Sequence, residues 1–98
     1  MATEPYMQIA LNEARSAAAS GEVPVGAVVV NPARDEILAQ ASNRVEELRD
    51  PTAHAEIIAI RRATAKAGHP RLVGCDLYVT LEPCPMCAAA ISLARFLR

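Results

Sequence analysis

Two short motifs constrain the fold of this chain more than any other feature of its sequence. The first is His54-Ala-Glu56 and the second is Pro83-Cys-Pro-Met-Cys87, so that together they read H-x-E…P-C-x-x-C. They offer one imidazole and two thiols, which zinc prefers as ligands, and one carboxylate that the metal does not need. A catalytic zinc ion takes three protein ligands and keeps a fourth position for water, with a base nearby. We therefore predict that the fold brings His54, Cys84 and Cys87 around one Zn2+ ion, with Glu56 beside it as the catalytic acid–base.

The spacing within each motif predicts where it lies on the secondary structure. Cys84 and Cys87 are three residues apart, which places them on one face of a helix. His54 and Glu56 are two residues apart, and in the middle of a helix they would point to nearly opposite sides. They can act together only where a helix begins, because both side chains can then lean over its end. We therefore predict two helix N-termini that face one metal ion, where the partial positive charge favours the thiolate forms of both cysteines.

The pattern of apolar residues predicts three helices and three strands in the order α-β-β-α-β-α. Glycines are expected to end the first two helices, and a β-branched run predicts a first strand that is buried on both faces. This order predicts a three-layer α/β arrangement. The crossover through the second helix predicts a third strand that is parallel to a neighbour, with strand order 2-1-3. The expected helices cover residues 5–20, 54–67 and a segment that starts near residue 84, and the expected strands cover residues 25–30, 37–42 and 77–80, with a polar connection over residues 43–53.

The composition predicts one small folded domain over residues 1–98. Hydrophobic residues make up 52% of the chain and the formal net charge is −1, which argues against a disordered tail. Aromatic residues make up only 3%, so the core is expected to be thin and aliphatic. The charge alone gives no electrostatic footprint for nucleic acid.

The cysteine count and the absence of a visible export signal predict a cytoplasmic protein. Two of the three cysteines lie in C-x-x-C, which in such a chain indicates metal binding rather than a disulfide framework. The longest apolar stretch, residues 23–30, is too short to span a membrane. We therefore expect no association with a membrane.

Several polar residues also have structural interpretations. A C-x-x-C with one distant histidine could be a structural zinc site, with His69 as the fourth ligand, although a residue between glycine and proline is expected in a surface loop. Cys75 fits a small buried apolar residue better than a ligand. Asn43 fits an ordinary turn residue. Asp50 could orient the imidazole of His54, or it could form the turn before the proline that follows it.

Four stretches of sequence, spread over nearly the whole chain, carry a family resemblance. They are residues 23–30 (VPVGAVVV), 43–44 (NR), 50–57 (DPTAHAEI) and 77–90 (LYVTLEPCPMCAAA). With these stretches the chain resembles the bacterial tRNA-specific adenosine deaminases, within the cytidine deaminase-like superfamily. The zinc motif is shared across that superfamily, whereas the longer phrases around it point to the adenosine branch.

The resemblance implies hydrolytic conversion of the wobble adenosine to inosine in a tRNA anticodon loop, usually by a homodimer. His54, Cys84 and Cys87 match the family's zinc ligands. Glu56 matches its proton shuttle, and Asn43 matches an asparagine that contacts the target nucleotide. The adenine would have to be flipped out of the loop to reach such a pocket.

The resemblance also implies a cytidine deaminase-like three-layer sandwich, with a mixed sheet flanked by helices. Family members continue past the position of residue 98 through further strands and a terminal helix, so we expect the C-terminal strands and helix to be missing here. The third strand would then be an open sheet edge. Two other functions stay open at this point: a deaminase of free bases or nucleotides that acts on guanine or cytosine, and an inactive zinc-binding fragment.

Overall fold

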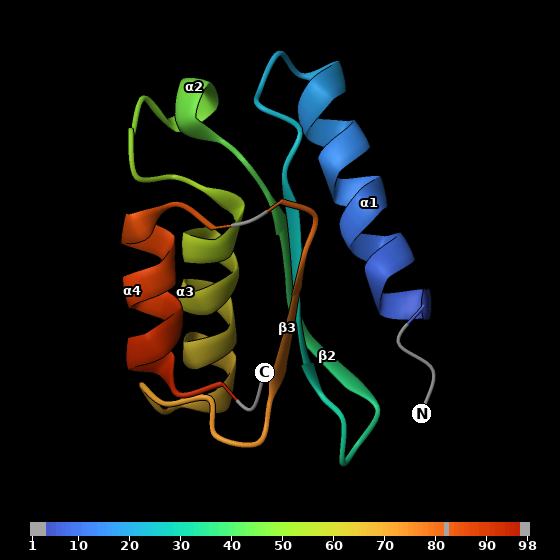
Figure 1. The fold of residues 1–98 in the computed structure, drawn as a ribbon, viewed down its shortest axis with the longest axis vertical. Helices are drawn as coiled ribbons and strands as arrows, with labels where there is room; N and C mark the ends of the chain where they lie inside the picture. The colour runs from blue at the N-terminus through green and yellow to red at the C-terminus, as the bar shows by residue number, and fades with distance from the viewer. Residues whose placement is uncertain (1–3, 82, 97–98) are drawn as a thin grey trace.

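The computed structural model describes residues 4–81 and 83–96, and within them it contains four helices and three strands (Figure 1). Three of the helices and all three strands correspond to predicted elements, in the predicted order and with boundaries that differ by about one residue. The elements are α1 (Glu4–Ala19), β1 (Gly26–Asn31), β2 (Glu36–Ser42), α2 (Val45–Leu48), α3 (Ala55–Ala67), β3 (Asp76–Val79) and α4 (Pro85–Ala94).

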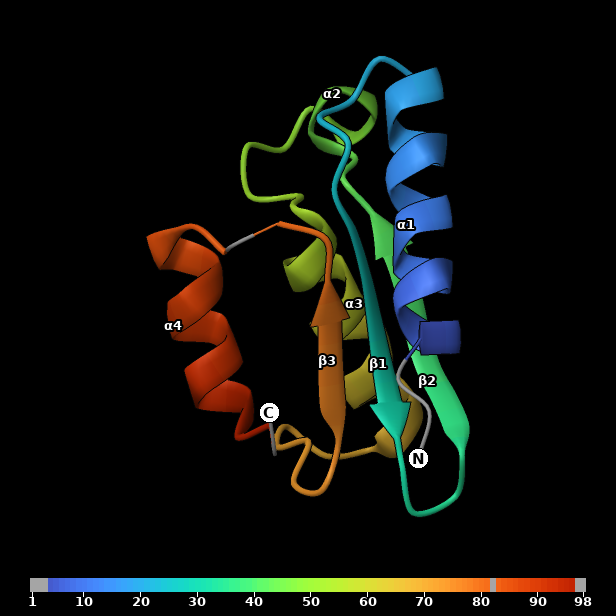
Figure 2. The same cartoon turned by 45° about the vertical axis from the view of Figure 1, so that its right-hand side comes forward.

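The strands form one sheet in the predicted order β2-β1-β3, but the third strand runs against its neighbour. β1 pairs antiparallel with both β2 and β3. The prediction that the third strand is parallel to a neighbour is therefore wrong, and the described strands form an antiparallel sheet, not a mixed one. The crossover through α3 does make β3 parallel to β2, but β1 lies between these two strands and runs the opposite way (Figure 2). Within the described residues, no strand covers the outer edge of β3.

β1 is buried on both faces, which confirms the prediction made from its β-branched run. On one face, Val28 and Val30 pack with Tyr6 and Ala10 of α1. On the other face, Val29 belongs to a larger cluster that includes several residues of α3. Figures 1 and 2 show α1 on one side of the sheet and α3 and α4 on the other, which is the predicted three-layer arrangement.

The backbone of α1 approaches the start of β1 very closely at Gly26. A Cβ atom on this residue would lie 1.9 Å from the carbonyl oxygen of Ala10 and 2.7 Å from the backbone nitrogen of Ala14. Both contacts are with backbone atoms of a packed helix, which cannot rotate away as the end of a side chain can. Glycine is therefore required at this position by space, not by its backbone angles.

The polar connection predicted over residues 43–53 contains a short helix, α2, which the sequence analysis missed. Its N-cap residue, Arg44, makes no side-chain hydrogen bond that caps the helix. Instead, the carboxylate of Glu22 accepts hydrogen bonds from the backbone N–H groups of Glu46 and Glu47, at 3.0 and 2.9 Å. Because this capping group comes from a distant part of the sequence, no local pattern could indicate it.

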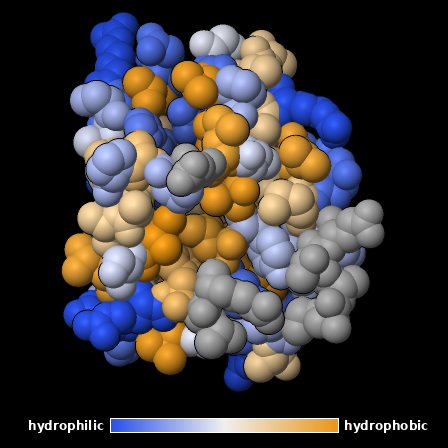
Figure 3. All heavy atoms as spheres, in the orientation of Figure 1, coloured by the Kyte–Doolittle hydropathy of each residue, from blue (hydrophilic) through white to orange (hydrophobic). Residues whose placement is uncertain are grey.

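Large apolar side chains reach the surface in several places. Figure 3 shows apolar residues across the middle of the face on view, between hydrophilic residues at its edges. Among the described residues, the most exposed large apolar side chains are those of Val73, with 76% of its surface exposed, and Leu93 of α4, with 69%. None of the helices in the described part of the chain has the length and apolar character needed to cross a membrane.

Candidate metal centre and adjoining cavity

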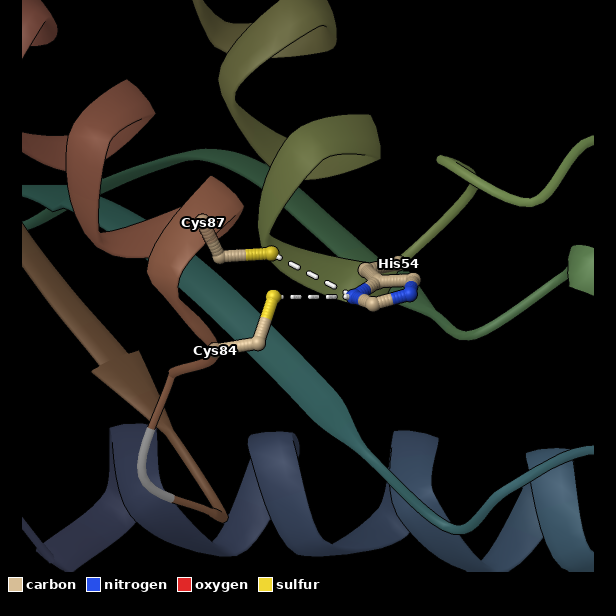
Figure 4. A group of neighbouring side chains, drawn as sticks. All are labelled: His54, Cys84 and Cys87. Carbon is tan, nitrogen blue, oxygen red and sulfur yellow. Dashed lines mark hydrogen bonds between the residues drawn. The ribbon is translucent and has the colours of Figure 1, made fainter.

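The two sequence motifs meet where α3 and α4 begin. His54 is the N-cap residue of α3 and Cys84 is the N-cap residue of α4, and each has extended backbone angles immediately before its helix. The sulfur atoms of Cys84 and Cys87 lie 3.6 and 3.4 Å from the Nδ1 atom of His54 (Figure 4). The ligand atoms of the three residues lie within 4.8 Å of one another. The structure therefore brings the three predicted ligands together at two helix N-termini.

The distances between these atoms fit a zinc ion. Zinc lies about 2.3 Å from a thiolate sulfur and about 2.0–2.1 Å from an imidazole nitrogen, and its structural and catalytic sites are tetrahedral. Those values place a coordinated nitrogen about 3.6 Å from a coordinated sulfur. The two observed separations, 3.6 and 3.4 Å, are close to this value. His54, Cys84 and Cys87 could therefore hold the ion with little movement of the chain.

The two thiols lie in different electrostatic environments. The backbone N–H of Cys87 is the main group that lowers the pKa of the Cys84 thiol, as expected at a helix N-terminus. Burial raises the pKa of the Cys87 thiol to about 12, and the neighbouring Cys84 and the charge of Glu56 act in the same direction. In the metal-free chain the helix end therefore favours the thiolate of Cys84, whereas burial opposes the thiolate of Cys87.

We call His54, Cys84 and Cys87 together the metal-ligand group. A cavity of about 210 Å³ opens beside it. Glu56 lies on this cavity, in the first turn of α3, and only 4% of its surface is exposed. Two of the three ligand residues also line the cavity, so a metal ion held by the group would face it. The residues that line the cavity are Val23, Val25, Asn43, His54, Glu56, Leu81 and Cys84, of which the three apolar ones were not predicted as part of a site.

Asn43 connects the cavity to the start of α3. Its side chain is buried, and its Oδ1 atom accepts a hydrogen bond from the backbone N–H of Ala55 at 2.8 Å. This bond satisfies an N–H group at the helix start, where the N-cap residue His54 makes no side-chain bond. The side-chain oxygen of Asn43 is thus committed to the helix, and its amide N–H groups are what it can offer to a ligand in the cavity.

The other polar residues considered in the sequence lie outside the metal-ligand group. His69 is exposed, and its Nδ1 atom accepts the backbone N–H of Arg71 at 3.0 Å, as expected for a loop residue. Asp50 accepts hydrogen bonds from the backbone N–H and the hydroxyl of Thr52, at 2.8 and 2.7 Å, so its role is to form the turn. Cys75 is buried in the apolar core, as predicted.

A second cavity, of about 360 Å³, lies at the opposite end of α3. It is larger than the cavity beside the metal-ligand group, but it contains none of the three ligand residues and neither Glu56 nor Asn43. Charged side chains that include Arg34 and Lys66 line it. Volume alone does not provide chemistry, so the candidate site is the smaller cavity.

Comparison with known proteins identifies the family. The cytidine and deoxycytidylate deaminase zinc-binding region matches residues 1–98. The chain belongs to this deaminase family. The family is zinc-binding, and the group of His54, Cys84 and Cys87 in this chain could bind a metal ion.

Individual deaminases match nearly all of the chain. The tRNA-specific adenosine deaminase of Agrobacterium fabrum is 58% identical over 93 residues, which cover 95% of this chain and 60% of that protein. A solved structure from studies of A-to-I editing by tRNA:A34 deaminases at the wobble position of transfer RNA is 56% identical, with a TM-score of 0.90, over 95% of this chain and 70% of that one. A guanine deaminase from Bacillus subtilis is 40% identical, with a TM-score of 0.90, over 98% of this chain and 63% of that one. This chain therefore spans about 60% of the length of that curated relative.

Proposed function

We propose that this chain carries out the hydrolytic conversion of adenosine to inosine at the wobble position of a tRNA anticodon loop. The observation that carries the proposal is that Glu56 lines the same cavity as His54 and Cys84, two of the three residues of the metal-ligand group. The names of two similar proteins support the substrate, since one is a tRNA-specific adenosine deaminase and the other belongs to studies of tRNA:A34 deaminases. A base in a single-stranded loop is also easier to flip into a cavity than a base in a duplex.

The residues of the site divide the chemistry between them. His54, Cys84 and Cys87 would hold a zinc ion, which supplies the Lewis acidity that makes a water molecule a competent nucleophile near neutral pH. Glu56 would accept a proton from the attacking water molecule as the water oxygen bonds to C6 of the adenine, and would pass protons to N1 of the ring and then to the exocyclic amine. The exocyclic C6–N6 bond would then break, so that ammonia leaves and a carbonyl remains at C6. The burial of Glu56 and its interaction with the Cys87 thiol support this role.

We assign Asn43 to substrate binding. Its oxygen is occupied by the backbone N–H of Ala55, so its amide N–H groups donate to an acceptor on the target nucleotide. The apolar side chains of Val23, Val25 and Leu81 give the same cavity the walls against which a flat base can pack.

Replacement of the proposed proton shuttle tests this function. Glu56→Gln should retain zinc at the wild-type stoichiometry but lose about 10²–10⁴ in the rate of inosine formation in an anticodon stem-loop, because the amide cannot accept the proton. Glu46→Gln is the matched control, since it makes the same change on an exposed side chain. Wild-type turnover by Glu56→Gln would show that Glu56 does not have this role.

Deamination of guanine is the second candidate, favoured by the likeness to the guanine deaminase from Bacillus subtilis. A panel of free guanine, free cytosine, nucleotides and the stem-loop would separate the candidates by the ammonia that each releases. Guanine turnover without stem-loop turnover would replace the tRNA proposal. Zinc binding without ammonia from any substrate would indicate an inactive zinc-binding fragment.

We further propose that residues 1–98 act as one deaminase domain and that this domain works in the cytoplasm, where its tRNA substrate would be found.

We also propose that the chain forms a homodimer. The exposed apolar side chains of Met86 and Leu93 on α4 support contact with a second copy of the chain. Light scattering on the purified chain tests the dimer, and a monomeric mass at micromolar concentration would contradict it.

A further inference from the structure

Glu22 is a buried acid that the proposed chemistry does not use. Only 8% of its surface is exposed, although it lies in the connection between α1 and β1. Its two carboxylate oxygens accept separate hydrogen bonds, from the backbone N–H of Glu46 at 3.0 Å and from that of Glu47 at 2.9 Å. The carboxylate therefore joins the segment after α1 to the first turn of α2, and Figure 2 shows these two segments next to each other.

Each of the two joined segments carries a wall of the candidate cavity. Val23 and Val25, one and three residues after Glu22, line the cavity, and so does Asn43, which lies shortly before α2. The backbone N–H of Asn43 also donates to the carbonyl oxygen of Val25 at 3.1 Å. Glu22 thus adds two hydrogen bonds to the contact that the backbone bond between Asn43 and Val25 makes between these two segments.

The contacts continue from residues 43–44 to the two neighbours of the ligand His54. The backbone N–H of Arg44 donates to the carbonyl oxygen of Ala53 at 3.0 Å, and the side chain of Asn43 accepts the N–H of Ala55. Ala53 and Ala55 flank the ligand His54. A displacement of residues 43–47 would therefore move both the substrate contact and its support at the start of α3.

A carboxylate is suited to this position because two N–H groups need acceptors at once. α2 has no cap of its own, since Arg44 at its N-cap has no side-chain acceptor and makes no capping bond. A carboxylate offers two acceptor oxygens, whereas a glutamine of the same shape offers one oxygen and one N–H2 group that would face a donor.

We propose that Glu22 is a positioning residue that holds the Asn43 wall of the cavity against the Val23–Val25 wall, and so sets the affinity for the target nucleotide. The proposal rests on the proposed function for its effect on substrate, but its structural part does not depend on activity. A residue that only added stability would leave the affinity of the folded protein for substrate unchanged.

Glu22→Gln and Glu22→Ala in the full chain test the proposal, with Glu46→Gln as the matched control because that carboxylate is exposed and only its backbone N–H takes part. In Glu22→Gln we expect unchanged zinc stoichiometry and faster amide hydrogen exchange at Glu46, Glu47 and Ala55. We also expect KM for the stem-loop to rise about tenfold with kcat within about twofold, as for loss of a hydrogen bond to a charged group. Glu22→Ala should enlarge the same effects.

Three results for Glu22→Gln would overturn the proposal. The first is amide hydrogen exchange at Glu46 and Glu47 that stays at the wild-type rate, and the second is faster exchange at these two residues without any change at Ala55. The third is faster exchange with an unchanged KM for the stem-loop. If Glu22→Ala fails to fold, the isosteric Glu22→Gln variant still decides. If the wild-type chain does not convert the stem-loop at all, the proposed function fails by itself, and the exchange at Ala55 still decides whether Glu22 positions the wall.

Discussion

Zinc affinity should rise steeply with pH, and the slope follows from the state of Cys87. This side chain is fully buried, and burial raises the pKa of its thiol to about 12. Near neutral pH almost every metal-free molecule therefore carries that proton, and zinc must displace it to bind the thiolate. One released proton lowers the dissociation constant about tenfold for each unit of pH. Between pH 6 and pH 8 the affinity should therefore increase about a hundredfold through Cys87 alone. Cys84, whose pKa is lowered, adds to the slope only at pH values below its own pKa.

Competition with a chromophoric chelator of known affinity measures the dissociation constant across this range. Titration calorimetry in two buffers of different ionisation enthalpy counts the protons released. Cys75→Ser is the control variant, because Cys75 is a cysteine outside the metal-ligand group and its loss should leave the slope unchanged. A dissociation constant that is constant from pH 6 to pH 8, or a proton count near zero, would refute the reasoning that Cys87 is a protonated thiol before zinc binds.

Two further predictions concern the frame of the site. Gly26→Ala should lower the free energy of unfolding, measured with urea, by more than about 3 kcal/mol, because the new Cβ would lie 1.9 Å from the Ala10 carbonyl oxygen. Gly68→Ala is the control, because its new Cβ would meet open space and only the backbone φ of +71° is strained; it should lower the free energy of unfolding by about 1–2 kcal/mol. The steric explanation would be contradicted if Gly68→Ala lowered that free energy as much as Gly26→Ala does, or more. Asn43→Asp keeps the acceptor for the Ala55 N–H but loses the amide donor, so the melting temperature should stay near that of the wild type while KM for the stem-loop rises. Asn43→Ala should also lose about 1 kcal/mol of stability, and an unchanged KM in both variants would remove Asn43 from substrate binding.

The placement of the two motifs could be predicted from the sequence because it depends on local spacing. His54 and Glu56 are two residues apart, and that spacing allows one shared site only at the end of a helix. The structure places His54 and Cys84 at the N-caps of α3 and α4, as the spacing predicted. The β-branched run of β1 was equally informative, because a strand without alternating polarity has to be covered on both faces.

The features that the sequence did not predict depend on contacts between distant residues. The first turn of α2 takes its hydrogen-bond acceptors from Glu22, and the start of α3 takes one from Asn43, twelve residues upstream of Ala55. The crossover rule fixes the direction of β3 only relative to β2, whereas its neighbour in the predicted order is β1, which runs antiparallel to β2. The pKa of Cys87 likewise depends on packing around the first turn of α4, whereas the sequence shows only that the residue is near a helix start.

The metal-ligand group also has a consequence for the order in which parts of the fold would come apart. His54 and Cys84 are thirty residues apart, and the chain between them contains α3 and β3. An ion bound to both would tie this stretch into a ring, which removes conformational freedom from the unfolded chain in the same way as a cross-link does. β3 has only four residues and pairs with β1 alone among the described strands, so it gains most from the ring. Loss of the ion would loosen β3 and α4 first and leave α1 packed on the β1–β2 hairpin.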